Sequence, residues 1–113
     1  MEISNNIIID EYRDILARGH KMLAHAHNGD WDALVALQDE YVCHVAQLAD
    51  IEKELDLDET TRVLKYELLV EICQAEDSVR GLLHARMREI SEIMTQSRSR
   101  QRVSQAYEAG MSG

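Results

Sequence analysis

The sequence predicts an all-α protein, an antiparallel bundle of three long helices followed by a short C-terminal helix. The chain has 113 residues with no proline and only five glycines, whereas a sheet protein of this length needs a glycine- or proline-marked turn every few residues. Apolar residues recur at helical spacing over most of the chain. The pattern breaks near residues 28–30 and 54–58, and two short connections make consecutive helices antiparallel neighbours.

The first helix has one apolar face at the i, i+3, i+4, i+7 spacing of an amphipathic helix, and this face comprises Ile8, Tyr12, Ile15, Leu16, Gly19, Leu23 and Ala26. Gly19 costs roughly 1 kcal/mol of helix propensity relative to alanine. Close approach of a neighbouring group explains it, and so does a mild flaw. We expect the helix to end at Asn28-Gly29, where glycine adopts a left-handed conformation, and Asp30 to cap the next helix.

The second and third helices follow from the same periodicity. The second carries Leu34, Leu37, Tyr41, Val45 and Leu48, flanked by Trp31, Val42 and Ala49. Acidic residues then crowd residues 54–58, which predicts a turn with Asp56 or Asp58 capping the third helix. About half the wheel of that third helix is apolar, through Leu64, Leu68, Leu69, Ile72, Cys73, Val79, Leu82, Leu83, Met87, Ile90, Ile93 and Met94.

The apolar face of the third helix is wider than two neighbouring helices need. Its last part is a strip that we predict to bind a partner, although each residue also fits a core position, and the strip consists of Leu83, Met87, Ile90 and Met94. Arg86 falls inside this face, where its aliphatic stem can lie along apolar surface or its guanidinium can pair with a partner carboxylate.

Charge divides the chain into an acidic body and a basic end. Up to Val79 there are 18 acidic and 6 basic side chains, and from Arg80 onward 6 arginines face 3 glutamates. We predict a helical body over residues 1–97 and a basic, mobile segment over 98–113 that contains the short helix. This segment is a predicted regulatory tail, held weakly against the body partly by charge, and its key residues are Arg98, Arg100, Arg102, Val103 and Tyr107.

Composition excludes several classes of protein. No apolar run approaches the roughly 20 residues needed to cross a bilayer, and the first residues lack a signal-peptide pattern, so we expect a cytoplasmic protein without membrane insertion. A net charge of −9 repels phosphate backbones and argues against direct nucleic-acid binding. Cys43 and Cys73 are isolated within helical patterns, and we expect two semi-buried thiols rather than a disulfide.

Catalytic and metal-binding patterns are weak throughout. His20, His25 and His27 do not share one face and lack a fourth ligand, so we predict no metal or other cofactor. The acids between Asp50 and Glu59 lack the glycine and terminal glutamate of a calcium-binding loop. A remote alternative is a small helical enzyme of chorismate mutase type, but the first two helices offer few cations for a dianionic substrate. We therefore predict no enzymatic activity.

Two segments resemble the FliT family of flagellar export chaperones. The first runs from Tyr12 to Tyr41, and its most specific part is Gly29-Asp30-Trp31-Asp32-Ala33-Leu34, a helix break followed directly by the only tryptophan. The second begins with Gly81-Leu82-Leu83 and continues through Arg86, Glu89, Ile90, Gln96-Ser97 and Ala106-Tyr107. The resemblance covers most of the chain in order, while residues 49–76 match in pattern only.

The resemblance implies a cytoplasmic chaperone that binds the filament-cap protein and docks it to the export ATPase and export gate of the flagellar type III apparatus. In some relatives the free chaperone also inhibits the flagellar master transcription activator, which is the alternative function. The family further implies a homodimer and a C-terminal segment that restrains docking. The matching tail residue is Tyr107, which is a packing anchor, a docking residue for the export gate, or both.

Overall fold

The computed structural model of the chain describes residues 5–112, and those residues form three helices without any strand. Helix α1 spans Asn5–His27, α2 spans Trp31–Glu52 and α3 spans Glu59–Ser112. The predicted all-α class and the three long helices are confirmed. The chain divides into two compact units, Met1–Gly81 and Leu82–Gly113, so α3 contributes to both. None of the described helices has the length and hydropathy needed to span a bilayer.

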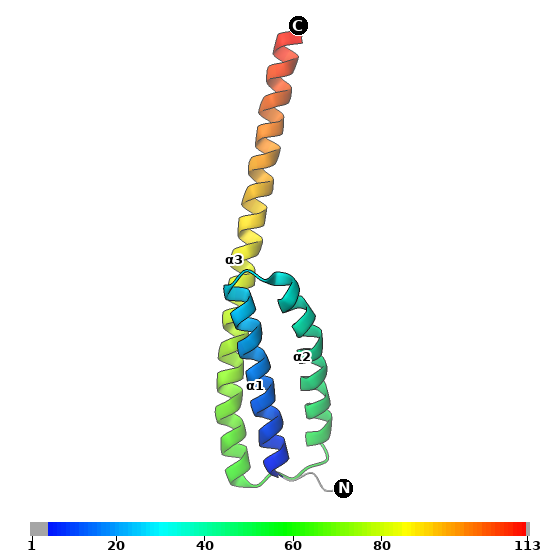
Figure 1. Ribbon diagram of the computed structural model, residues 1–113, viewed down its shortest axis with the longest axis vertical. Coiled ribbons are helices and arrows are strands. Elements are labelled where there is room, and N and C mark those ends of the chain that lie inside the picture. The colour runs from blue at the N-terminus through cyan, green and yellow to red at the C-terminus, as the bar shows by residue number, and fades with distance from the viewer. Residues whose placement is uncertain (1–4, 113) are drawn as a thin grey trace. The chain divides into compact units, whose positions relative to one another are not determined.

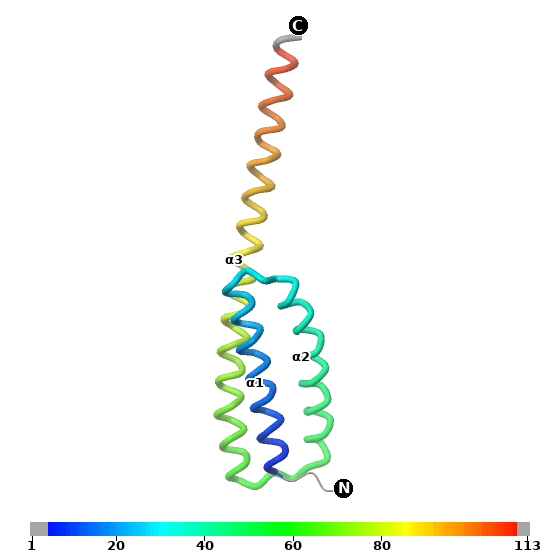
Figure 2. Tube along the Cα trace, in the orientation of Figure 1, coloured from blue at the N-terminus to red at the C-terminus, as the bar shows by residue number. Residues whose placement is uncertain are grey.

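In the first unit, α1, α2 and residues 59–81 of α3 lie side by side and are joined by short turns (Figures 1 and 2). The side chains of Ile8, Ile15 and Leu34 are at most 2% exposed and lie at the centre of the core. The predicted face of α1 is largely correct, with Leu16 and Leu23 only half-buried. Ile9 and Met22 are also buried. They were missed because α1 contacts both other helices, which buries an arc wider than one stripe.

The turn between α1 and α2 uses glycine as predicted. Gly29 has a φ of 72°, in the left-handed region that favours glycine, and it lies two residues after His27, where α1 ends. Asp30 occupies the N-cap position of α2, but its side chain makes no capping hydrogen bond. Its carboxylate lies 3.4 Å from Nδ1 of His25 instead. Asp30 is thus the N-cap residue as predicted, but its side chain does not cap the helix because it turns back towards the end of α1.

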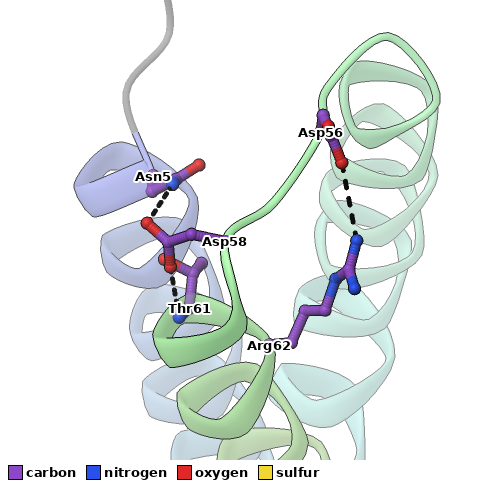
Figure 3. Close-up of polar contacts among 5 residues, drawn as sticks. All are labelled: Asn5, Asp56, Asp58, Thr61 and Arg62. Atoms are coloured by element: carbon purple, nitrogen blue, oxygen red, sulfur yellow. Dashed lines mark hydrogen bonds and ion pairs between the residues drawn. The ribbon is translucent and has the colours of Figure 1, made fainter.

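The turn between α2 and α3 is held by Asp58, one of the two predicted caps (Figure 3). The backbone N–H of Thr61 donates to Oδ1 of Asp58 at 2.7 Å, and the Asn5 amide donates to Oδ2 at 2.6 Å. Asp56 lies 3.5 Å from the Arg62 guanidinium and does not cap the helix. The hydrogen bonds from Thr61, followed by that from Asn5, lower the pKa of Asp58 below its ordinary value of 3.8.

Replacing Asp58 by alanine should lower the melting temperature, since it removes the cap of α3 and the link to Asn5. The matched control Asp56→Ala removes only the contact with Arg62 and should melt near the wild type. Because the pKa of Asp58 is depressed in the folded chain, its contribution is present above pH 3.8 and is lost as the pH falls further. The difference between wild type and Asp58→Ala should therefore shrink on acidification. An equal effect of both substitutions at neutral pH would contradict the cap.

Gly19 lies where α1 meets the other two helices, but the neighbouring side chains leave room for a methyl group at this position. A methyl group added at Gly19 would lie 3.7 Å from Cβ of Ala75 and 4.0 Å from Cε2 of Tyr41, which are ordinary van der Waals contacts. Gly19→Ala should therefore stabilise the protein by up to about 1 kcal/mol, because alanine fits and has the higher helix propensity. Thermal unfolding measures this, and a destabilised variant would mean that the site tolerates no side chain.

The C-terminal part of the chain differs from the sequence prediction. Residues 97–107 continue α3, so the separate short helix predicted around Val103–Tyr107 is not confirmed. Residues 97–107 contain neither proline nor glycine, so nothing in this polar stretch interrupts a helix. The compact units divide after Gly81. The predicted body of residues 1–97 and the mobility of the described part of 98–113 stay predictions, and Gly113 lies outside the described residues.

Candidate partner-binding surface

Polar contacts tie α3 to the other two helices in the first unit. The Tyr41 hydroxyl of α2 donates a hydrogen bond to the Glu76 carboxylate of α3. The ammonium of Lys65 on α3 donates to Glu52 of α2 at 2.7 Å, and it lies 5.7 Å from the centre of the Tyr12 ring on α1. Burial, followed by the hydrogen bond to Glu76, raises the pKa of Tyr41, so its hydroxyl stays protonated and remains a donor at neutral pH.

A second set of contacts ties α2 to α1. Nε2 of His44 lies 2.5 Å from the Glu11 carboxylate, and the Arg18 guanidinium lies 3.2 Å from Glu40. The side of α2 that carries Glu40 and His44 therefore faces α1, while the side that carries Glu52 faces α3. Helical periodicity then gives the side of α2 on which each of its remaining residues lies.

The contacts with α3 also set the register of the two helices. Tyr41 meets Glu76 and Glu52 meets Lys65, and the two contacts are separated by the same number of residues on both helices. Intermediate residues therefore lie at matching levels in opposite order. By this register Val45 is close to the level of Cys73, and Ala49 is close to the level of Leu69.

Apolar side chains remain exposed along this junction. Val45 lies seven residues before Glu52, on the side of α2 that faces α3, yet it is 40% exposed, and neighbouring Val42 is 55% exposed. On α3, Tyr66 is 69% and Val70 39% exposed. We call this surface the α2–α3 patch and define it by Val42, Val45 and Ala49 of α2 and Tyr66, Val70 and Cys73 of α3.

The α2–α3 patch has the properties of a docking surface for a helix. Its residues on each helix are spaced by three or four positions, so they form two parallel stripes, and Val35 and Val63 extend these stripes. Soluble monomers rarely leave a contiguous apolar surface of this kind uncovered unless it binds something. A third amphipathic helix can pack its apolar face against two such stripes.

Sequence reasoning assigned four of the six patch residues to the core or its edge, and it did not single out Tyr66 or Val70. Val45 was placed on the core face of the second helix, with Val42 and Ala49 beside it, and Cys73 was expected to be semi-buried. All four are exposed, and so is Cys43, so the prediction of semi-buried thiols is wrong. The signal in the sequence was the width of the apolar arc on the second helix, which exceeds what Leu34, Tyr41 and Leu48 alone require.

In the second unit, the predicted partner-binding strip is largely exposed. Met87, Ile90 and Met94 are 65%, 42% and 50% exposed, while Leu83 is half-buried. The three exposed residues line one depression together with Arg98. Arg86 is half-buried and lies 3.4 Å from Glu89 on its own helix. This exposure is what a docking role requires, and the role itself stays a prediction.

The predicted tail residues line a different depression. Arg100, Val103 and Tyr107 lie together with Gln96, Ser99 and Ser104, and Tyr107 is 69% exposed. Because an α-helix turns about 100° per residue, Val103 and Tyr107 lie roughly 150° around the helix from the strip that contains Ile90. The second unit thus carries two separate apolar faces, and Arg102 lines neither depression.

The histidine and carboxylate side chains of the described residues form no candidate metal site. No group of three histidine, cysteine, aspartate or glutamate side chains among residues 5–112 is placed to hold a metal ion. Of the predicted histidine cluster, His20 and His27 are exposed, and His25 is paired with Asp30. The candidate site that the exposed side chains of the first unit define is therefore the apolar α2–α3 patch.

Comparison with known proteins gives a consistent result. The family model described as flagellar protein FliT matches residues 9–109. The flagellar protein FliT of Pectobacterium carotovorum is 31% identical over 88% of this chain and 79% of its own length. That of Yersinia enterocolitica is 32% identical over 88% of this chain and 83% of its own length. The crystal structure of FliT from Bordetella bronchiseptica superposes with a TM-score of 0.69 at 34% identity, over 76% of this chain and 97% of that one.

Proposed function

Because this chain belongs to the FliT family of flagellar proteins, we propose that it is a cytoplasmic, non-enzymatic export chaperone. Its first unit acts as an antiparallel three-helix bundle whose surface shields an apolar helix of the filament-cap protein before export. The observation that carries the proposal is the α2–α3 patch, which exposes apolar side chains on two adjacent helices. A helix of the cargo that is buried in the assembled filament needs such a cover while it is in solution.

The second unit has a separate part in this proposal. The strip formed by Leu83, Met87, Ile90 and Met94 offers cargo a second apolar surface, and its exposed methionines adapt to differently shaped side chains. The face with Arg100, Val103 and Tyr107 docks the loaded chaperone to the export ATPase or the export gate. Because these two faces lie on different sides of the helix, cargo and export component need not compete for the same residues.

Two further roles follow from the family relationship. The chaperone, once free of cargo, offers its apolar surfaces to a second partner, the flagellar master transcription activator, whose binding would couple export to gene expression. The second role is pairing of two chains into a homodimer. The arginines of the tail, Arg98, Arg100 and Arg102, act as a salt-sensitive latch that limits access of partners.

Co-purification from the native host followed by titration calorimetry tests the proposal. The filament-cap protein should be recovered with the tagged chain and should bind it directly. Met87→Asp should weaken this binding, since a charge in an apolar interface must be desolvated without a partner. The control is His84→Asp, an exposed position of the same helix outside both depressions. Recovery of no flagellar partner, or equal binding by both variants, would argue against the proposal.

A further inference from the structure

The charges around the α2–α3 patch are strongly one-sided. The first unit holds 18 acidic and 7 basic side chains, and the chain has no lysine or arginine from Met22 to Glu52, a range that contains all of α2. On the outer edge of the patch, Asp39 lies three residues before Val42, and Glu67 lies three residues before Val70. At this spacing their carboxylates adjoin the exposed valines.

These two carboxylates lack local compensation. Neither Asp39 nor Glu67 has an ion-pair partner within residues 5–112, and both are exposed. The cations nearest the patch are Lys65, which precedes Tyr66, and Lys53 and Arg62, which lie four residues from Ala49 and Tyr66. All three lie near the end of the patch next to the α2–α3 turn. They are already paired, Lys65 at 2.7 Å with Glu52, Lys53 at 3.3 Å with Asp50 and Arg62 at 3.5 Å with Asp56.

We infer that the α2–α3 patch binds a basic amphipathic helix, one that carries lysine or arginine on both flanks of its apolar stripe. This inference rests on the proposed function, because it specifies the chemistry of the partner segment that the same patch covers. The apolar stripe of such a helix lies against Val45 and Cys73, and its flanking cations reach Asp39 on α2 and Glu67 on α3. The acidic field of the first unit also accelerates its approach.

The opposite assignment is disfavoured by electrostatics. A helix flanked by acids would place its carboxylates next to Asp39 and Glu67 while both sides lose water, and like charges at such an interface weaken binding. The face of the second unit that contains Met87 and Ile90 adjoins Arg98 and suits an acidic partner instead. The α2–α3 patch and this face therefore differ in the charge of the segment they accept.

The test uses two synthetic helical peptides with one apolar stripe and either lysine or glutamate at every flanking position. Their binding to the full chain is followed by fluorescence anisotropy. The lysine peptide should bind at least about tenfold more tightly at low salt, and this preference should shrink as sodium chloride is added. Asp39→Lys combined with Glu67→Lys should abolish or reverse the preference. The control, Asp14→Lys with Glu71→Lys, changes net charge equally at exposed positions outside the patch and should keep it.

Equal or tighter binding of the glutamate peptide would overturn the inference, and so would a preference that survives reversal of Asp39 and Glu67. A homodimer of the wild-type chain that is lost in Val45→Asp, measured by sedimentation, would also overturn it, because the patch would then be covered by a second copy. Failure of the inference can be distinguished from failure of the proposed function. If Val45→Asp weakens binding of the filament-cap protein but the charge reversal at Asp39 and Glu67 does not, the docking role stands and only the inference fails.

Discussion

The Val45→Asp variant should lose most of its affinity for the filament-cap protein while keeping its melting temperature. Val45 lies in the α2–α3 patch and is 40% exposed in the free chain, so an aspartate there is solvated and costs the fold little. In the complex the same carboxylate is buried without a partner, which weakens binding by about 100-fold or more, or roughly 2.7 kcal/mol. Titration calorimetry and thermal unfolding measure the two quantities on the same preparation.

The control for this result is Ala36→Asp. Ala36 is also an exposed apolar residue of α2, but it lies on the side of the helix away from α3. Both variants add one negative charge to the same acidic helix, so a general electrostatic effect would weaken binding equally in both. Loss of binding in Val45→Asp alone assigns the effect to the patch. Equal binding by the two variants, with unaltered folding, would remove Val45 from the interface.

Substitutions at Leu34 and Val35 should separate the effects on stability from the effects on binding. They are adjacent in sequence, but Leu34 is 1% and Val35 61% exposed. Leu34→Ala should destabilise the chain by about 2–5 kcal/mol, since it removes buried methyl groups and leaves a cavity. Val35→Ala should change stability by no more than about 0.5 kcal/mol, because its side chain already contacts water.

Chemical denaturation of both variants checks this pair, and the binding assay completes it. Val35 extends the α2–α3 patch, so Val35→Ala should weaken cargo binding although it leaves stability unchanged. A stability loss in Val35→Ala comparable with that of Leu34→Ala would mean that another part of the chain covers Val35 in solution. The assignment of α2 to one buried and one exposed apolar face would then be wrong.

Helix periodicity predicted most of the fold because the core residues follow it. Ile8, Tyr12, Ile15, Leu34, Tyr41, Leu48, Ile72 and Val79 are all buried at positions that the pattern assigned to the core. Gly29 and Asp58 were predicted as the ends of helices because each depends on local backbone chemistry, and both are confirmed. The position of Asp30 was predicted correctly, but the contact of its carboxylate with His25 across the α1–α2 turn was not.

The α2–α3 patch could not be separated from the core by sequence alone. A valine in the core and an exposed valine that binds a partner are equally apolar and occur at the same helical spacing. Val45 is distinguished only by the contacts that orient α2, above all Glu52 with Lys65 and His44 with Glu11. Those contacts join residues far apart in sequence, and periodicity within one helix contains no information about them.

The most direct test of the patch uses its own cysteine. Cys73 lies in the α2–α3 patch and Cys43 lies outside it on α2, and both thiols are free and exposed. Alkylation rates are measured on the Cys43→Ser and Cys73→Ser variants, each of which keeps one thiol, with and without the filament-cap protein. At a cap-protein concentration near ten times its Kd, labelling of Cys73 should slow about tenfold because only the free chain reacts, while labelling of Cys43 should not change. Slowed labelling of Cys43 with unchanged labelling of Cys73, while the proteins remain bound, would contradict the α2–α3 patch as the cargo-binding surface.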